Sequence, residues 1–214
     1  MINFVIKSVD ESISTQSELI ENLKNGIINP PFALIAKKQI KGYGSRGNEW
    51  KSDEGNLYFS FCIDEKDLSS TIPPPSFSIY FAFLMKEFLS TKGSKIWLKW
   101  PNDFYLNNKK IGGVITTKIK TTYVCGIGLN LTNSPDYAGV LDINITPNEV
   151  VFGFLNILKN KIPWKQIFSK FVVEFELSKK FYTNINGNKF HLNNANLYED
   201  GSIMINNKRV YSLR

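Results

Sequence analysis

The stretch GYGSRGNEWKSDEGNLYFSF, residues 42–61, decides between two classes of fold. Its first three glycines have the G-x-G-x-x-G spacing of a dinucleotide-binding loop, and an apolar strand is predicted just before it, at 32–38. In that fold the third glycine must open a helix whose N-terminus faces the pyrophosphate. Here the following residues have no helical periodicity and lead into a second predicted strand, at 56–63. We therefore predict a glycine-rich loop between two strands instead of a dinucleotide site.

What this loop holds stays open at this point. Its amide groups and Arg46 suit a phosphate, and Trp50 at its end suits a purine or another flat surface. A hairpin connection without any ligand fits the same residues.

Composition limits the kinds of site that the chain can form. Its 214 residues, 43% of them hydrophobic, indicate one globular domain with a small appendage. The two cysteines, Cys62 and Cys125, lie in apolar strand-like runs, and His191 is the one histidine. A zinc site or a Cys–His nucleophile is therefore not expected. No signal peptide or membrane-spanning run is visible, so we expect a cytoplasmic protein without membrane partners.

The net charge of +7 has two interpretations. It fits an anionic partner such as a nucleotide, a nucleic acid or an acidic protein. The lysines are scattered, however, and a solvated surface rich in Lys and Asn has the same charge.

The rest of the chain alternates between predicted strands and helices. Thr15 and Glu18 have the spacing of a capping box, and Thr146-Pro147-Asn148-Glu149 resembles another helix start. From residue 184 the chain is rich in Asn and Gly, with short strand-like pieces. Further strands are predicted at 2–8, 96–100, 109–119 and 121–131, the last two as a hairpin, and helices at 14–26, 76–91, 147–160 and 163–182.

A second stretch, KWPNDFYLNNKKIGG at residues 99–113, has the features of a binding site. Asn102 and Asp103 follow a predicted strand and a proline, so that a fixed turn can aim their side chains. Glycine inside a strand marks either a bulge or the close approach of a ligand to the backbone. The glycines placed in this way are Gly112 and Gly113 in one strand and Gly126 and Gly128 in its expected partner.

In this order and spacing, GYGSRGNEWKSDEGNLYFS, KWPNDFYLNNKKIGG and GIGLNL resemble the motifs of biotin protein ligases. SISTQ at 12–16, Gln39 and the ending DGSIMIN…VYSLR match the family as well. The resemblance implies an α+β fold like that of class II aminoacyl-tRNA synthetases, with a mixed or antiparallel central sheet flanked by helices. It further implies a catalytic domain over 1–183 and a small SH3-like β domain over 184–214.

The resemblance also implies an activity. Such enzymes use ATP, with Mg²⁺, to convert biotin into biotinoyl-5′-AMP and pyrophosphate. They then transfer biotin to a lysine of a carrier, here by analogy the biotin carboxyl carrier protein of acetyl-CoA carboxylase. A lipoate–protein ligase of the same fold is the alternative enzyme, and a non-catalytic binding module is the alternative from another class.

The same resemblance assigns the site residues. Lys110 is expected to bridge the biotin carboxylate and the α-phosphate, with Arg46 as a second cation. Asp103 is expected to act electrostatically, because a carboxylate of ordinary pKa is a weak base for an ammonium group. The biotin-binding residues are expected to be Ser14, Thr15, Gln16, Gln39, Gly42, Tyr43, Gly44, Ser45, Lys110, Gly112, Gly113 and Gly126. The residues for ATP and adenylate are expected to be Arg46, Trp50, Asn102, Asp103, Lys110, Gly128 and Asn130.

Two departures from the family pattern carry expectations of their own. The two loop arginines of the family align with Tyr43 and Ser45, so Arg46 is displaced by one position. A displacement of one residue turns a side chain to the opposite side of an extended segment. We infer that Arg46 replaces the missing arginine. In addition, no DNA-binding helix-turn-helix precedes the first predicted strand, so neither DNA binding nor repressor activity is expected.

If Arg46 does replace the missing arginine, Arg46→Ala removes a charge-assisted contact. We expect biotin affinity to fall, or adenylate release to accelerate, by roughly tenfold. Titration calorimetry and the release rate of labelled adenylate measure the two quantities. An unchanged affinity together with an unchanged release rate would refute the inference.

Overall fold

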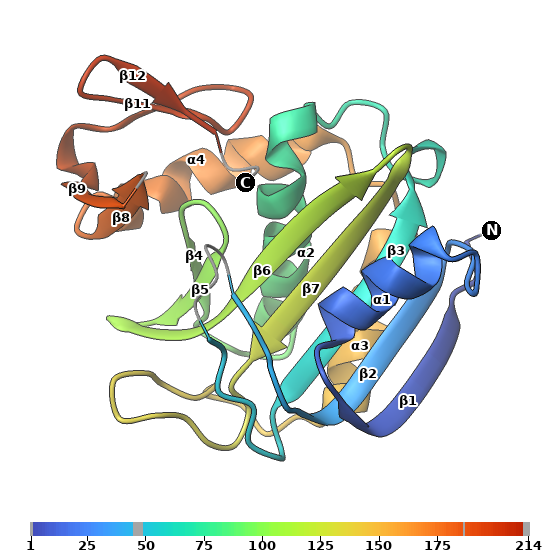
Figure 1. Cartoon of the computed structure of the whole chain (residues 1–214). Helices are drawn as coiled ribbons and strands as arrows, with labels where there is room; N and C mark the ends of the chain where they lie inside the picture. Colours follow the sequence, from blue (N-terminus) through green and yellow to red (C-terminus); the bar gives the residue numbers. More distant parts are fainter. Residues whose placement is uncertain (1, 45–48, 186, 212–214) are drawn as a thin grey trace.

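A seven-stranded sheet forms the centre of the chain in a computed structural model that describes residues 2–44, 49–185 and 187–211 (Figure 1). The strand order is β1-β2-β3-β7-β6-β5-β4. β1 and β2 are parallel, and all other neighbouring strands are antiparallel. The predicted mixed sheet is thereby confirmed. Its strands are β1 (Val5–Ser12), β2 (Phe32–Gln39), β3 (Leu57–Asp64), β4 (Trp97–Lys99), β5 (Asp103–Leu106), β6 (Lys109–Ile119) and β7 (Thr122–Leu129).

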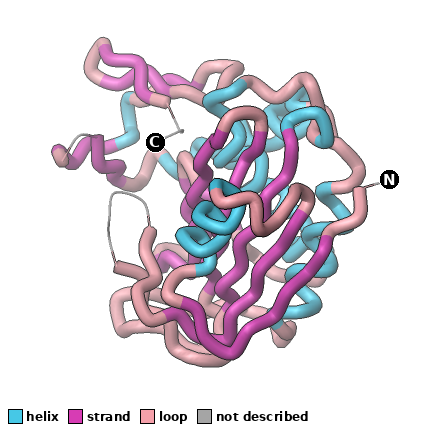
Figure 2. Tube along the Cα trace, turned by 45° about the vertical axis from the view of Figure 1, so that its right-hand side comes forward, coloured by secondary structure: helices cyan, strands magenta, loops and turns pink. Residues whose placement is uncertain are grey.

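The two faces of this sheet are covered unequally (Figures 1 and 2). The large hydrophobic core lies on the face covered by α2, α3 and α4. Among the described residues, α1 is the one helix on the opposite face, over a small cluster formed by Leu19, Leu34, Cys62 and Val124. The helices are α1 (Thr15–Lys24), α2 (Phe77–Thr91), α3 (Pro147–Leu158) and α4 (Trp164–Ser178), with short 3-10 turns at Glu65–Asp67, Pro74–Ser76 and Leu192–Asn194.

Strand alternation separates the residues of the core from those of the open face. In β3, Phe59 and Phe61 stack on each other and pack against Phe154 of α3. The residue between them, Ser60, points to the other face and contacts Thr15 of α1. Because successive side chains of a strand point to opposite faces, the same short strand supplies both a hydrophobic core and a polar surface.

Capping boxes were predicted at the starts of two helices, and the structure contains one of them. The capping box of Thr146 and Glu149 is confirmed at the start of α3. The one predicted for Thr15 is wrong, because Ser14 is the N-cap and accepts from the Ser17 amide. The side chain of Glu18 instead accepts a hydrogen bond from Ser12 (2.7 Å). Thr15 is therefore the first helical residue, and its hydroxyl bonds to Gln39 and Ser60.

Several strand and helix boundaries differ from the predicted ones. The first strand runs over Val5–Ser12 instead of 2–8, because its pairing with β2 extends to the Ser12–Gln39 pair. β5 was not predicted as a separate strand. The last helix ends at Ser178, four residues before the predicted end.

The C-terminal region consists of short strands, as predicted, and they form two small antiparallel sheets. These are β8 (Tyr182–Ile185) with β9 (Asn188–His191), and β10 (Asn196–Leu197) with β11 (Ile203–Ile205) and β12 (Lys208–Val210). Buried side chains of β11 belong to the main core. The indole N–H of Trp100 donates to the Gly201 carbonyl (2.9 Å), and that of Trp164 donates to the Glu199 carbonyl (2.6 Å).

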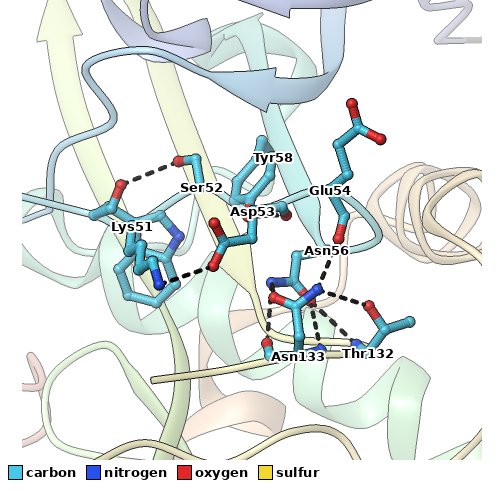
Figure 3. Close-up of polar contacts among 9 residues, drawn as sticks. Lys51, Ser52, Asp53, Glu54, Asn56, Tyr58, Thr132 and Asn133 are labelled. Carbon is cyan, nitrogen blue, oxygen red and sulfur yellow. Dashed lines mark hydrogen bonds and ion pairs between the residues drawn. The ribbon is translucent and has the colours of Figure 1, made fainter. Parts of the chain in front are cut away.

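Asn56 fixes the connection between the glycine loop and β3 (Figure 3). Its Oδ1 accepts from the backbone amides of Leu131 (2.8 Å), Thr132 (3.1 Å) and Asn133 (3.4 Å). Its Nδ2 donates to Asn133, whose own amide donates to the Glu54 carbonyl (2.7 Å). One buried side chain thus joins the segment before β3 to the segment after β7.

Asn56→Ala should lower the free energy of unfolding by about 2–3 kcal/mol, because buried backbone amides lose their acceptor. Urea unfolding followed by circular dichroism measures this change. Asn144→Ala, at an exposed position beyond the same connection, is the control and should stay within about 0.5 kcal/mol of the parent. Equal stabilities of the two variants would contradict the role of Asn56.

Candidate active site

A cavity opens on the sparsely covered face of the sheet, beside the N-terminus of α1. Its walls come from α1, from β2 and the loop after it, and from β3, β5, β6 and β7. The predicted site residues that it brings together are Ser14, Thr15, Gln16, Gln39, Tyr43, Gly44, Trp50, Asn102, Asp103, Lys110, Gly113, Gly126 and Gly128.

Three glycines form the floor of this cavity. A Cβ atom on Gly126 would lie 2.9 Å from Gln16 Oε1, and one on Gly128 would lie 2.9 Å from the Trp50 ring. A Cβ on Gly113 would lie 3.3 Å from Asp103 Oδ1. Any side chain at Gly126 or Gly128 would therefore displace a neighbour that lines the cavity.

Two other predicted glycines do not line it. A Cβ on Gly112 would meet the Gly128 carbonyl (2.5 Å) and Leu129 (2.8 Å), so this glycine permits close packing of β6 and β7. A Cβ on Gly42 would meet Gln39 Nε2 and Ser52 Oγ, both at 2.7 Å. The absence of a side chain on Gly42 thus leaves space for Gln39, which lines the cavity.

A chain of hydrogen bonds fixes one polar wall. Gln39 Oε1 accepts from the amide (2.8 Å) and the hydroxyl (3.1 Å) of Thr15, and Gln39 Nε2 donates to Ser52 Oγ (3.2 Å). The Thr15 hydroxyl also contacts Ser60 Oγ (2.8 Å). Ser52 Oγ in turn donates to the Trp50 carbonyl (3.0 Å; Figure 3). Hydrogen bonds within the protein therefore join Thr15, Gln39, Ser52 and Ser60 in this wall.

Two polar atoms in the cavity are buried and lack a partner within the described residues. Gln16 donates through Nε2 to the Val124 carbonyl (3.1 Å), which leaves its Oε1 as an unpaired acceptor. Trp50 Nε1 is an unpaired donor above Gly128. Since buried polar groups are almost always hydrogen-bonded, these atoms are suited to a ligand that offers both a donor and an acceptor.

A carboxylate between two lysines forms the charged end of the cavity. Asp103 Oδ1 lies 2.6 Å from Lys110 Nζ, and Oδ2 lies 3.6 Å from Lys99 Nζ. Burial tends to raise the pKa of Asp103, but the charges of Lys110 and then Lys99 outweigh it, so the pKa lies below its ordinary value. Asp103 is therefore ionised at neutral pH, as expected of an electrostatic residue.

Lys110 also borders a second, adjoining cavity. Asn130, Tyr137 and Trp50 line that space together with Lys110. Asn130 donates through Nδ2 to the Gly139 carbonyl (3.0 Å) and so holds the loop that forms the outer wall. The two cavities share Gly44, Trp50 and Lys110 as lining residues, so they adjoin at Lys110.

Some predictions stay untested and some site residues were missed. Ser45 and Arg46 lie outside the described residues, so their expected roles remain predictions. Tyr58 and Ser60 line the first cavity but were not predicted. A signal existed for Ser60, since it is a polar residue in the apolar run NLYFSFCI.

Residue types that hold metals are not grouped in the part of the chain that the structure covers. Among residues 2–44, 49–185 and 187–211, no three His, Cys, Asp or Glu side chains are placed to bind one ion. A helix long and apolar enough to cross a membrane is likewise absent from these ranges.

Comparisons with known proteins agree with this geometry. Residues 9–131 match the model of the biotin/lipoate A/B protein ligase family. The crystal structure of biotin acetyl coenzyme A carboxylase synthetase from Helicobacter pylori with bound biotinylated ATP is similar over 96% of this chain and 98% of that one, with a TM-score of 0.92 and 38% identity.

Curated relatives are matched over part of their length. Biotin–protein ligase 2 of Arabidopsis thaliana is 35% identical over 46% of this chain and 32% of its own. Biotin–[acetyl-CoA-carboxylase] ligase of Paracoccus denitrificans is 28% identical over 65% of this chain and 60% of its own. Since the family model spans more than half of the 214 residues, the chain belongs to the biotin/lipoate A/B protein ligase family.

Proposed function

We propose that the chain is a biotin protein ligase that forms biotinoyl-5′-AMP and transfers biotin to a carrier lysine. One observation carries the proposal: the glycine floor, an unpaired buried acceptor on Gln16 and the Lys110–Asp103 pair line one cavity. The similar synthetase from Helicobacter pylori, whose crystal structure has bound biotinylated ATP, supports it at 38% identity.

The polar atoms of the cavity favour biotin over lipoate. The ureido ring of biotin carries two N–H donors and one carbonyl acceptor. Gln16 Oε1 is a buried acceptor without a partner among the described residues, and it lies against Gly126. The dithiolane of lipoate has no N–H group and would leave that acceptor unsatisfied, which costs about 1–3 kcal/mol.

Lys110 is placed to serve the adenylation step. In that step a biotin carboxylate oxygen bonds to the α-phosphorus of ATP, and the bond to pyrophosphate breaks. Two anions must approach each other, so a fixed cation between them lowers the barrier. Lys110 lies at the junction of the two cavities, with its side chain 39% exposed. We propose that Mg²⁺ enters with ATP, held by the phosphates.

The transfer step completes the reaction. The amine of a carrier lysine attacks the acyl carbon, an amide bond forms, AMP leaves, and the ammonium proton passes to solvent. The carrier that we propose is the biotin carboxyl carrier protein of acetyl-CoA carboxylase, since the relative from Paracoccus denitrificans is a biotin–[acetyl-CoA-carboxylase] ligase. The absence of repressor activity, the cytoplasmic location and the boundary at residue 183 remain predictions.

The purified chain should release pyrophosphate when biotin, ATP and Mg²⁺ are added together. A biotin-accepting carrier domain added next should gain the mass of one biotin, measured by intact-protein mass spectrometry. Lipoate in place of biotin is the control and should yield neither signal. Activity with lipoate alone would replace the proposal with the lipoate–protein ligase, and inactivity with both would overturn it.

Lys110→Met should lower the rate of biotin-dependent pyrophosphate release by about a hundredfold or more, because the cation between two anions is removed. Lys109→Met is the matched control, since this neighbour is exposed and should keep the rate within about threefold. A Lys110 variant as active as the Lys109 variant would contradict the assigned role.

A further inference from the structure

Lys99 is a buried lysine that no step of the proposed reaction uses directly. It ends β4, and its side chain is 8% exposed. In the β4–β5 pair it lies directly opposite Asp103, so both side chains point to the same face of the sheet. Its Nζ lies 3.6 Å from Asp103 Oδ2 and 5.5 Å from the centre of the Tyr105 ring. Burying an ammonium group is costly, so a lysine kept there calls for a reason.

The two lysines beside Asp103 differ in their freedom to move. Lys110 is partly exposed and borders both cavities, so its ammonium group can turn toward a ligand. Lys99 is 8% exposed, and its ammonium group lies near the Tyr105 ring. Each lysine approaches a different carboxylate oxygen. The arrangement therefore pairs Asp103 with one movable and one fixed cation.

The proposed reaction requires the movable cation to leave. When Lys110 turns to the biotin carboxylate and the α-phosphate, Asp103 loses its partner at 2.6 Å. The Asp103 carboxylate, which is 21% exposed, would then lack its nearest cation. Removing one partner of a buried ion pair is strongly unfavourable. A second cation that stays in place removes most of this cost.

We propose that Lys99 is a positioning residue, which holds the Asp103 carboxylate in place and compensates its charge while Lys110 turns toward the substrate anions. This inference rests on the proposed function and adds a residue to it. Lys99 touches neither substrate in this scheme, and its effect on the rate passes entirely through Asp103. We therefore expect substitutions of Lys99 and Asp103 to have strongly non-additive effects on the adenylation rate.

A double-mutant cycle on the adenylation step tests the proposal. Lys99→Met keeps the length and burial of the side chain and removes its charge. In the otherwise unchanged chain it should slow single-turnover pyrophosphate release at saturating biotin by about tenfold or more, with the KM for biotin within about threefold. In an Asp103→Asn background, which has no carboxylate to compensate, the same change should slow release by less than about threefold. Lys99→Arg, which keeps the charge, should restore most of the rate.

Lys86→Met is the matched control for the loss of a buried lysine. Lys86 is 16% exposed and pairs with Glu174 (3.1 Å), on the core side of the sheet. It should lower stability without changing the adenylation rate by more than about threefold. If Lys99→Met fails to fold, Lys99→Gln is measured in both backgrounds instead.

The outcomes separate the two proposals. Equal losses from the Lys99 change with and without the Asp103 carboxylate, or no loss at all, would overturn the positioning role alone. A parent chain that releases no pyrophosphate with biotin would overturn the proposed function and this inference with it.

Discussion

One short helix, α1, covers one face of the central sheet, whereas three helices cover the other, and the location of the site depends on this inequality. The alternation of β3 and β7 places large apolar side chains such as Phe61 in the core and small or polar residues such as Ser60 and Gly126 opposite. Because α1 is 10 residues long, it shields only a small apolar cluster. The rest of that face is left to polar side chains and bare backbone. Stability and binding are therefore supplied by the same strands, from opposite faces.

Electrostatics divides the site along its length. At the glycine floor the atoms without partners are neutral, so that end suits an uncharged polar ring. At the other end Lys99, Asp103 and Lys110 carry a net charge of +1, which suits a carboxylate and a phosphate arriving together. This distribution of charge orients a ligand that is polar but neutral at one end and anionic at the other.

Strand alternation in the sequence predicted most strands of the main sheet, and the resemblance to biotin protein ligases supplied most of the cavity residues. Strand alternation and glycines inside strands are local signals, and they led to Gly113, Gly126 and Gly128. The direction of Gly112, whose Cβ would meet the buried side chains of Leu129 and Phe104, was not predictable in the same way, since the register of β6 with β5 shifts between Phe104 and Tyr105. The partner of Ser60 lies 45 residues away, and the carbonyl bound by Trp100 lies 101 residues away. Such contacts are properties of the folded chain and not of any short stretch.

Trp50 gives the site an optical property. Its indole lies over Gly128 inside the cavity, whereas Trp97, Trp100 and Trp164 are buried in the core. The emission of an indole depends on the polarity and hydrogen bonding around it, and Trp97, Trp100 and Trp164 line neither of the two cavities. The intrinsic fluorescence of the chain therefore contains one component that originates in the cavity. Occupancy can be followed through that component without attaching a dye to either partner.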